Sequence, residues 1–420
     1  MPDTHRAGTP GTFIRSDEAT STALPLSGVR VIDISSSYAA PTTSMYLADM
    51  GADVVKVEPI RGDDARGWGP PFLNGEAAWF LSVNRNKRSV CLDITTPAGH
   101  ATLMNLLESA DVFVENLTPA KLAKHGLALD ALAQRFPALV ICALSGYGLD
   151  GPDSALPGYD LIAQARSGLM SVTGPAGGAP QRVSTALSDV AAGTIAAFAV
   201  SSALVRQRTT GVGEIIDISL LEADLAFLSP RIASYLAGEP EPHPSGGTDS
   251  VVAIYQSFET VDRPIVVAIG NDRHWLKACR VLGLEHLSTQ SDLATNAGRR
   301  DRRQEIVRMF QDVFSTVTAD RALEMLQSVG VPSSRIQRLS EVVADPQVVA
   351  RQGIVKQDHP VAGPFESVAS PWKLASDPNA RTIATPAPLK GQHTREVLAE
   401  LDLEDEQIDE LIREGVAWSR

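Results

Sequence analysis

Asp189 is the side chain whose type and position most directly suggest chemistry. It lies in the run from Ser184 to Gly193, where a polar stretch gives way to an Ala-rich segment that we expect to be helical from Val190 to about Arg208. This places the carboxylate at or just before the first turn, where unpaired N–H groups and the helix dipole favour an anion. A carboxylate held ionised there can act as a nucleophile toward an activated acyl group. An ordinary N-cap aspartate would occupy the same position, and this alternative stays open.

The composition limits the classes of protein to which the chain can belong. Its 420 residues are enough for about two or three domains. Hydrophobic residues make up 44% and charged residues 21%, which is ordinary for a globular protein. A formal net charge of -13 argues against a nucleic-acid partner and against an anionic membrane surface. We find no apolar run of about 18 residues, so we expect no transmembrane helix and no membrane partner.

The cysteines and histidines give no metal-ligand pattern. Cys91, Cys142 and Cys279 are widely spaced, which suits reduced thiols and a cytoplasmic location. The eight histidines form no H-x-x-H or H-E-x-x-H pair, so we expect no metal. The first 25 residues are rich in Thr, Ser, Gly, Pro and charge, and we interpret 1–25 as a disordered leader.

The segments that must position Asp189 alternate between strands and helices. We expect strands at 29–35, 54–58, 89–93, 112–115, 139–144 and 214–220, and helices at 39–51, 96–110, 119–135 and 222–236. This alternation predicts a Rossmann-like, doubly wound α/β domain over 26–225. A nicotinamide site is not expected, because residues 35–41 stand where a G-x-G-x-x-G fingerprint would be, although Glu58 is placed as a ribose-binding acid would be.

A Pro/Gly-rich break at 238–250 separates this region from a second, smaller α+β domain, which we place at 226–340 with its linkers. Strands are expected at 251–256 and 265–269, and helices at 272–282, 299–314 and 319–329. The basic cluster at 299–303 is interpreted as a solvated helix start. Residues 341–420 end in two amphipathic helices, and we expect this segment to return to the large domain.

A series of short motifs resembles one known family. They are LSGVRVID at 26–33, GADVVKVE at 51–58, NRNKRS at 84–89, DVFVEN at 111–116, SGYG at 145–148, GYD at 158–160 and GQHT at 391–394. In order and spacing they resemble the family III CoA-transferases, the group containing formyl-CoA transferase and carnitine CoA-transferase. The similarity extends from about Leu26 to about Val416.

The resemblance implies a mechanism and an assembly. In that family an aspartate matching Asp189 is the covalent nucleophile, and CoA passes between two carboxylic acids through an aspartyl-CoA thioester. Such chemistry needs no cofactor besides CoA itself as the carrier, and its partners are acyl-CoA and free carboxylic acids. Family members form interlocked homodimers, so we expect the same here.

The resemblance leaves two other functions open. Alpha-methylacyl-CoA racemases share the fold and keep the aspartate, but they pair it with a histidine where this chain has Tyr159. A neutral tyrosine is a poor second base, which favours the transferase. A non-catalytic acyl-CoA-binding protein is the other alternative, and it would not need a nucleophile.

The CoA site of formyl-CoA transferase is matched only in part. Leu92, Asn116 and Lys124 match positions that contact CoA, while Pro59 and Thr95 replace two cationic contacts. Arg88 and Lys87 are further candidates for phosphate contacts, with a solvated basic turn as the alternative interpretation. Tyr38 replaces an active-site glutamine, which argues against formyl or oxalate specificity, and a glycine loop is shortened to 245–248, where Gly246 and Gly247 could form a mobile lid.

The segments GDDAR at 62–66 and WGPP at 68–71 resemble the branch that acts on succinate, glutarate and hydroxymethylglutarate. The resemblance implies succinyl-CoA as donor and a dicarboxylate as acceptor. A dicarboxylate needs a cation for its distal carboxylate, ideally a guanidinium. Arg66 and Arg182 are the candidates.

Overall fold

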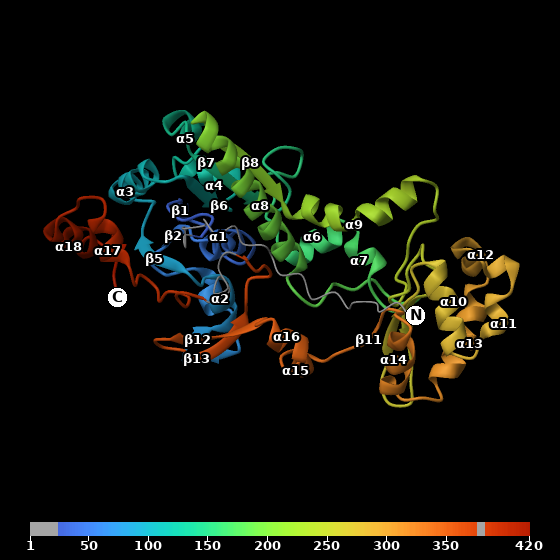
Figure 1. The fold of residues 1–420 in the computed structure, drawn as a ribbon. Helices are drawn as coiled ribbons and strands as arrows, with labels where there is room; N and C mark the ends of the chain where they lie inside the picture. Colours follow the sequence, from blue (N-terminus) through green and yellow to red (C-terminus); the bar gives the residue numbers. More distant parts are fainter. Residues whose placement is uncertain (1–23, 376–382) are drawn as a thin grey trace, which may run out of the picture. The chain divides into compact units, whose positions relative to one another are not determined.

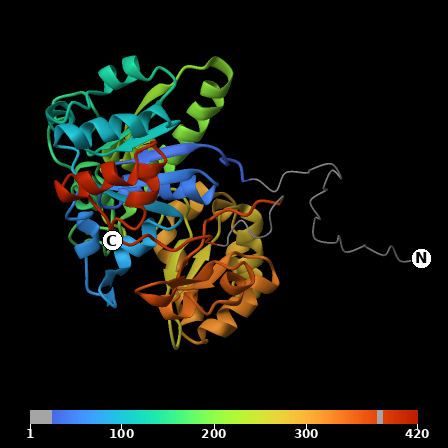
Figure 2. The same ribbon diagram turned by 90° about the vertical axis from the view of Figure 1, so that its left-hand side faces the viewer.

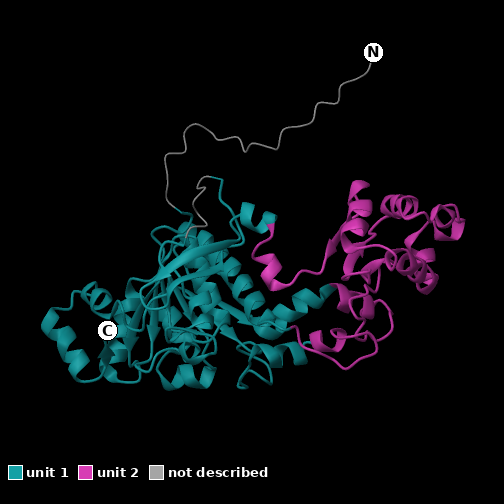
Figure 3. Ribbon diagram, turned by 90° about the horizontal axis from the view of Figure 1, so that it is seen from below, with its two compact units in different colours: residues 1–167, 184–229, 346–420 teal, residues 168–183, 230–345 magenta. Residues whose placement is uncertain are grey.

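The computed structural model describes residues 24–375 and 383–420, and these divide into two compact units (Figure 3). The first unit comprises Met1–Ser167, Ser184–Ser229 and Pro346–Arg420, and the second comprises Gly168–Val183 and Pro230–Asp345. The domain limits expected after 225 and after 340 lie a few residues from these bounds. Residues 168–183 differ, because they group with the second unit and not with the large domain in which the sequence placed them. The leader expected at 1–25 lies outside the described residues, apart from its last two positions.

A seven-stranded sheet forms the middle of the first unit, in the order β14-β5-β2-β1-β6-β7-β8 (Figure 1). Neighbouring strands are parallel, except that β14 is antiparallel to β5. The strands are β1 (Arg30–Asp33), β2 (Asp53–Glu58), β5 (Lys87–Leu92), β6 (Val112–Glu115), β7 (Val140–Ser145), β8 (Glu214–Ser219) and β14 (Ala417–Trp418). Their Val and Ile side chains are mostly buried on both faces, as in parallel sheets covered by helices on each side.

The winding of the sheet reverses at β1. The chain runs outward from β1 through β2 to β5, then returns to the other side of β1 and continues through β6, β7 and β8. This confirms the doubly wound α/β fold. In such sheets ligands bind outside the carboxyl ends of the strands that flank the reversal, which here are β1 and β6.

Helices cover both faces of the sheet. One face packs against α1 (Ala39–Asp49), α6 (Asp160–Arg166), α8 (Leu187–Thr210) and the start of α9 (Leu220–Leu236). The other packs against α3 (Pro97–Glu108), α4 (Pro119–Lys124), α5 (Leu129–Arg135), α17 (Thr394–Ala399) and α18 (Asp405–Arg413). Figure 2 shows the C-terminal helices, in red, beside the strands. The C-terminal segment is therefore part of the first unit.

Helix α8 corrects one expectation from the sequence. It is long and apolar enough to cross a membrane by length and composition, with a mean hydropathy of 1.5 over its most apolar window, whereas we found no such run. One face of the helix, including Ala192, Ala196 and Val200, is buried in the core of the first unit. Burial of this face explains part of its apolar composition.

Smaller elements complete the first unit. They are the hairpins β3 (Phe72–Leu73) with β4 (Glu76–Ala77) and β12 (Ile354–His359) with β13 (Gly363–Val368), the helices α2 (Ala78–Val83) and α16 (Pro346–Ala350), and a 3₁₀ turn at Asp64–Gly67. The second hairpin was not predicted. Phe365 of β13 packs on the small cluster around Phe80 and Leu81, which holds the hairpin near α2.

The second unit is a small α+β domain. Its sheet has the order β11-β10-β9 and is antiparallel, with β9 (Tyr255–Phe258), β10 (Ile265–Ala268) and β11 (Ser333–Arg335). Its helices are α7 (Leu169–Val172), α10 (Asp272–Val281), α11 (Glu285–Ser288), α12 (Asn296–Asp301), α13 (Arg303–Phe314), α14 (Ala319–Ser328) and α15 (Leu339–Val342), with a 3₁₀ turn at Ser291–Leu293. Phe258, Trp275, Phe310 and Phe314 form an aromatic centre of its core.

Two details of the second unit differ from the predictions. The first strand is at Tyr255–Phe258, shifted from the expected 251–256, and the helix expected at 299–314 is split into α12 and α13. The basic cluster at 299–303 is also not a fully solvated helix start. Arg299 is buried, where its guanidinium bonds to the carbonyl of Leu293 at 2.9 Å and lies over the ring of Trp275.

Candidate active site

The carboxyl ends of β1 and β6 are tied together by one side chain. Asn116 follows β6, and its amide Nδ2 donates to the carbonyl of Ser36 at 2.8 Å while its Oδ1 accepts from the N–H of Ser36 at 3.1 Å. These two bonds fix the loop after β1 at the point where the winding of the sheet reverses. The predicted CoA residue Asn116 therefore lies at the edge where ligands bind in such folds.

The loop from Ser35 to Tyr38 is held from the other side by a buried ion pair. The Nζ of Lys56 lies 2.8 Å from the Asp63 carboxylate and donates to the carbonyl of Ser35 at 2.7 Å. Asp63 in turn accepts from the N–H of Ser37, which adopts a left-handed φ of 74°. Burial alone would raise the pKa of Asp63, but Lys56 holds this pKa below its ordinary value. The network ties the loop that leads into α1 to β2 and to Asp63.

Asp189 lies in the first turn of α8. The helix begins at Leu187, and its N-cap is Ala186, which makes no side-chain cap. The alternative that Asp189 is an ordinary N-cap is therefore wrong. Within the described parts of the chain, no hydrogen bond or ion pair joins its carboxylate to another residue. Its two oxygens are left for a ligand.

The ionisation of Asp189 differs from the expectation. Burial, followed by the nearby carboxylates of Asp160 and Asp224, raises the pKa of Asp189 to about 7. We expected an anion stabilised by the helix dipole, but the loss of solvation and the repulsion from two acids outweigh that dipole. At neutral pH the Asp189 carboxyl is close to half ionised.

Asp160 and Asp224 are site residues that the sequence analysis missed. Ser188 bridges them, since its N–H donates to Asp160 at 2.9 Å and its hydroxyl donates to Asp224 at 2.9 Å. Asp160 also accepts from Gln164 at 2.8 Å. Only the GYD motif at 158–160 gave a signal for one of them. Together these bonds hold the start of α8 in place and keep two carboxylates near Asp189.

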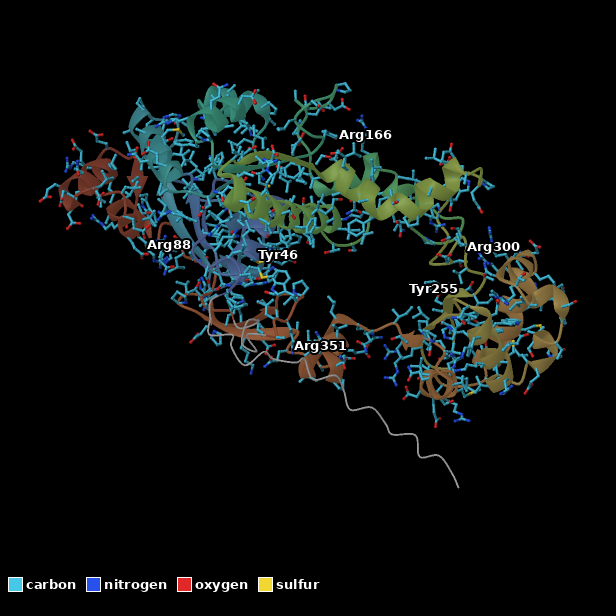
Figure 4. All side chains as sticks on the ribbon, turned by 45° about the horizontal axis from the view of Figure 1, so that its top comes forward. Tyr46, Arg88, Arg166, Tyr255, Arg300 and Arg351 are labelled. Atoms are coloured by element: carbon cyan, nitrogen blue, oxygen red, sulfur yellow. The ribbon has the colours of Figure 1, made fainter. Side chains whose placement is uncertain are left out.

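Close packing of α8 on α1 brings Asp189 toward the loop after β1. Gly193, one helical turn beyond Asp189, lies so near α1 that a Cβ there would be 2.5 Å from the carbonyl oxygen of Ala39 and 2.8 Å from the Cβ of Thr42. Val190 and Tyr38 both line one cavity of about 420 Å³, together with residues of α2 and β13. Tyr46 of α1, labelled in Figure 4, lines the same cavity.

Tyr38 and Tyr159 each precede a helix of the first unit. Tyr38 precedes α1, with its hydroxyl 3.3 Å from that of Ser82 and its ring edge-on to Trp79. Tyr159 precedes α6 and is 62% exposed. The position that a histidine base would occupy in a racemase thus holds an exposed phenol.

The two basic candidates on β5 are engaged with acids of the first unit, which argues against their expected role as phosphate contacts. Arg88 bonds to Asp53 at 2.6 and 2.9 Å and to Glu396 at 2.9 Å (Arg88 is labelled in Figure 4). Lys87 is buried and bonds to Asp33, the carbonyl of Pro41 and Asn84. Burial lowers the pKa of Lys87 to about 7. Both side chains are therefore engaged within the first unit.

Arg66 is also engaged within the first unit, which argues against its expected role in binding a substrate carboxylate. Its Nε and Nη2 donate to the two carboxylate oxygens of Glu58 at 2.7 and 2.6 Å. Nη2 also donates to the carbonyl of Pro388 at 3.1 Å, the guanidinium lies over the ring of Phe80, and the side chain is only 13% exposed. The guanidinium N–H groups that would bind a dicarboxylate already donate to Glu58.

The remaining candidates are placed as follows. Leu92 is buried in β5, where it pairs with Ala417, and Lys124 is exposed at the end of α4. Arg182, Gly246 and Gly247 belong to the second unit. Both glycines have left-handed φ angles, of 63° and 87°, and line a cavity of about 560 Å³ on the sheet of that unit. Among residues 24–375 and 383–420, no group of three His, Cys, Asp or Glu side chains could hold a metal ion.

The comparisons with known proteins decide the family. Residues 26–394 match CoA-transferase family III. The chain belongs to this family. It is a CoA-transferase, and the resemblance found in the sequence motifs is confirmed.

Relatives and solved structures are similar to this CoA-transferase over almost its full length. Succinyl-CoA:glutarate CoA-transferase of Homo sapiens is 38% identical, covering 93% of this chain and 90% of the relative. Succinate–glutarate CoA-transferase of Agrobacterium fabrum is 35% identical, covering 90% and 96%. A CAIB/BAIF family protein from Brucella suis has a TM-score of 0.78 and 32% identity, covering 90% of this chain and 100% of that one. The protein Rv3272 from Mycobacterium tuberculosis has a TM-score of 0.78 and 28% identity, covering 89% and 99%.

Proposed function

We propose that this CoA-transferase moves CoA from succinyl-CoA to a small dicarboxylate, with Asp189 as the covalent nucleophile. The substrates are inferred from the relatives, among which are succinyl-CoA:glutarate, succinyl-CoA–D-citramalate and succinyl-CoA:mesaconate CoA-transferases. One observation supports Asp189 as the nucleophile. Its carboxyl group lies in the first turn of α8 and makes no hydrogen bond or ion pair with another described residue.

The environment of Asp189 suits nucleophilic attack. A carboxylate stabilised by several hydrogen bonds would be a weak nucleophile, whereas this one is destabilised by burial and by two neighbouring acids. Because its pKa is raised, the ionised carboxylate is the more reactive nucleophile. The reaction then proceeds through the fraction of molecules in which Asp189 is ionised. The exposed phenol of Tyr159 offers no second base, so racemisation is not supported by the site.

The proposed reaction proceeds in four displacements. The Asp189 carboxylate attacks the thioester carbonyl of the donor, giving a mixed anhydride and CoA thiolate. The thiolate attacks the Asp189 carbonyl, giving an aspartyl-CoA thioester and free succinate. The acceptor carboxylate then attacks this thioester and releases thiolate, which attacks the acyl carbonyl of the new anhydride. The products are the acceptor's CoA ester and the original Asp189 carboxylate.

The binding residues that we retain are few. Asn116 at the winding reversal, Leu92 and Lys124 are proposed to contact CoA, and Arg182 to bind the distal carboxylate. Tyr38 is proposed to line the acyl site, and Gly246 with Gly247 to form a lid. Arg88, Lys87 and Arg66 are not retained, because their charges are paired within the first unit.

The test combines turnover with trapping. Succinyl-CoA is incubated with the enzyme and a panel of carboxylates, and acyl-CoA products are followed by mass spectrometry. We expect glutarate or another dicarboxylate to be converted faster than monocarboxylates of similar length. Hydroxylamine added during turnover should convert the peptide that contains Asp189 into a hydroxamate.

Asp189→Ala should abolish transfer, while the matched variant Asp153→Ala, in which a partly exposed aspartate that pairs with Arg166 is removed, should retain it. An unmodified Asp189 peptide under turnover conditions would refute the covalent mechanism. Preferred turnover of monocarboxylates would overturn the dicarboxylate assignment but leave the family unchanged.

A further inference from the structure

The second unit contains a cavity that the transfer reaction does not account for. It has a volume of about 230 Å³ and is bounded by the end of α9, the loop at 239–250 and the first residue of α13. Two arginines line it, Arg231 from α9 and Arg303 from α13, together with Tyr235, His243 and several hydroxyl side chains. The cavity is smaller than the pockets that hold drug-sized ligands, so it cannot enclose an acyl-CoA.

Neither arginine is satisfied by the chain. Arg231 is half-buried, and no hydrogen bond or ion pair joins it to another described residue. Arg303 donates from Nη2 to the carbonyl of Val252 at 2.7 Å, but its Nε is fully buried without an acceptor. A buried guanidinium N–H without an acceptor costs free energy that a bound oxyanion would recover.

The acids that border the cavity are already engaged. Glu239 accepts from Arg300 at 3.1 Å, and Figure 4 labels Arg300 on the second unit. One oxygen of Asp249 accepts from the N–H groups of Val251 and Val252, both at 2.7 Å. Burial, followed by the charge of Arg300, lowers the pKa of Arg303, and Asp249 offsets this only in part. Counting Arg300, which pairs with Glu239, three arginines and two acids surround the cavity, so guanidinium groups outnumber carboxylates.

We infer that this cavity binds a small oxyanion, a phosphate or carboxylate group, between the guanidinium groups of Arg231 and Arg303. Two planar guanidinium groups that line one cavity can donate several hydrogen bonds to the oxygens of such a group, whereas a lysine would supply only a point charge. Hydroxyl groups around the cavity, including that of Tyr235, add neutral donors. None of the residues retained above for CoA or for the substrates lines this cavity.

The experiment measures binding in the full chain with Asp189→Ala, so that no turnover occurs. Inorganic phosphate and succinate are titrated separately by isothermal calorimetry, with sodium chloride at matched ionic strength as the blank. We expect one site per chain for at least one of the two anions. A response to phosphate only, or to succinate only, assigns the source of the oxyanion when Arg231→Met weakens that response.

Arg231→Met should weaken that binding by about tenfold or more, as expected for loss of a charged hydrogen bond. Arg303→Lys keeps the charge and loses the buried Nε, so it should also weaken binding. Arg321→Met is the matched control, because Arg321 is exposed and paired with Glu324 on α14. Binding of both anions that is unchanged in Arg231→Met and Arg303→Lys, with each variant folded by circular dichroism, would overturn the inference. Absence of binding in the parent at tens of millimolar anion would overturn it as well.

Discussion

At the scale of single residues, the chemistry depends on which force sets the ionisation of Asp189. A helix start stabilises an anion by about 0.3–1 kcal/mol when exposed. Each unit of pKa corresponds to about 1.4 kcal/mol, so a rise from 3.8 to about 7 shows that burial and the acids Asp160 and Asp224 dominate. The residue is therefore poised between a neutral acid and a reactive carboxylate at physiological pH.

This balance predicts the pH dependence of the reaction. The nucleophile is the ionised form, so kcat/KM for succinyl-CoA should rise as the pH increases through about 7 and level off above it. Asp224→Asn removes one negative charge and keeps a hydrogen-bond acceptor for Ser188, so the midpoint should move to lower pH. Initial rates measured from about pH 5 to pH 9 test this.

Asp153→Asn serves as the control for that profile, because Asp153 pairs with Arg166 and does not contribute to the raised pKa of Asp189. Its midpoint should match that of the parent. A midpoint that stays in place in Asp224→Asn would show that another group controls the rate.

Residue types in the sequence were enough to find Asp189 but not its surroundings. The run at 184–193 and the family motifs pointed to this one aspartate. The sequence does not show that Ser188 would bring Asp160 and Asp224 beside it, since this depends on the packing of α6 and α9 against α8. The ion pairs of Arg66 and Arg88 were not foreseen either: Arg88 pairs with Asp53 on the neighbouring strand β2, and Arg66 pairs with Glu58 at the end of β2.

At the scale of elements, the active site depends on the contact between α8 and α1. The strands and helices that flank this contact were predictable. Runs of Val and Ile that alternate with helix signals predict buried parallel strands in a doubly wound fold. The β12–β13 hairpin was not, since its alternating residues are half exposed and bury few apolar side chains. Elements that pack weakly leave little pattern in the sequence.

Gly193 provides a test of the α8–α1 contact. Alanine is the better helix former by about 1 kcal/mol, so propensity alone predicts that Gly193→Ala stabilises the protein. A Cβ at 2.5 Å from the carbonyl oxygen of Ala39 instead forces the helices apart, and we expect a net loss of about 1–3 kcal/mol. Because α1 follows the Tyr38 loop, kcat should fall too. Chemical unfolding and steady-state rates measure the two effects.

Ser202→Ala is the matched control on the same helix, since Ser202 is exposed and its hydroxyl bonds only within α8. It should leave stability and rate nearly unchanged. A Gly193→Ala variant that is as stable and active as Ser202→Ala would show that the two helices can separate without effect on the site.

At the scale of the whole molecule, the single chain leaves apolar side chains of α8 uncovered. Phe198 is 74% exposed and Val205 is 70% exposed, although the helix packs its other face into the core. Exposed aromatic and aliphatic groups on one helix are typical of surfaces that bind another protein. Together with the family resemblance, this supports the prediction of an interlocked homodimer.

The prediction is tested by the mass of the protein in solution. Light scattering at micromolar concentration should give about twice the 44.7 kDa of one chain. Phe198→Asp combined with Val205→Asp would place two charges in the proposed interface, so fewer chains should assemble and the mass should fall toward that of one chain. Val261→Asp alters an exposed valine in the second unit and serves as the control for a general effect of added charge.

A parent protein that has the mass of one chain would contradict the prediction, because an interlocked pair cannot separate without large rearrangement. A dimer that withstands both charges would show that α8 is not part of its interface.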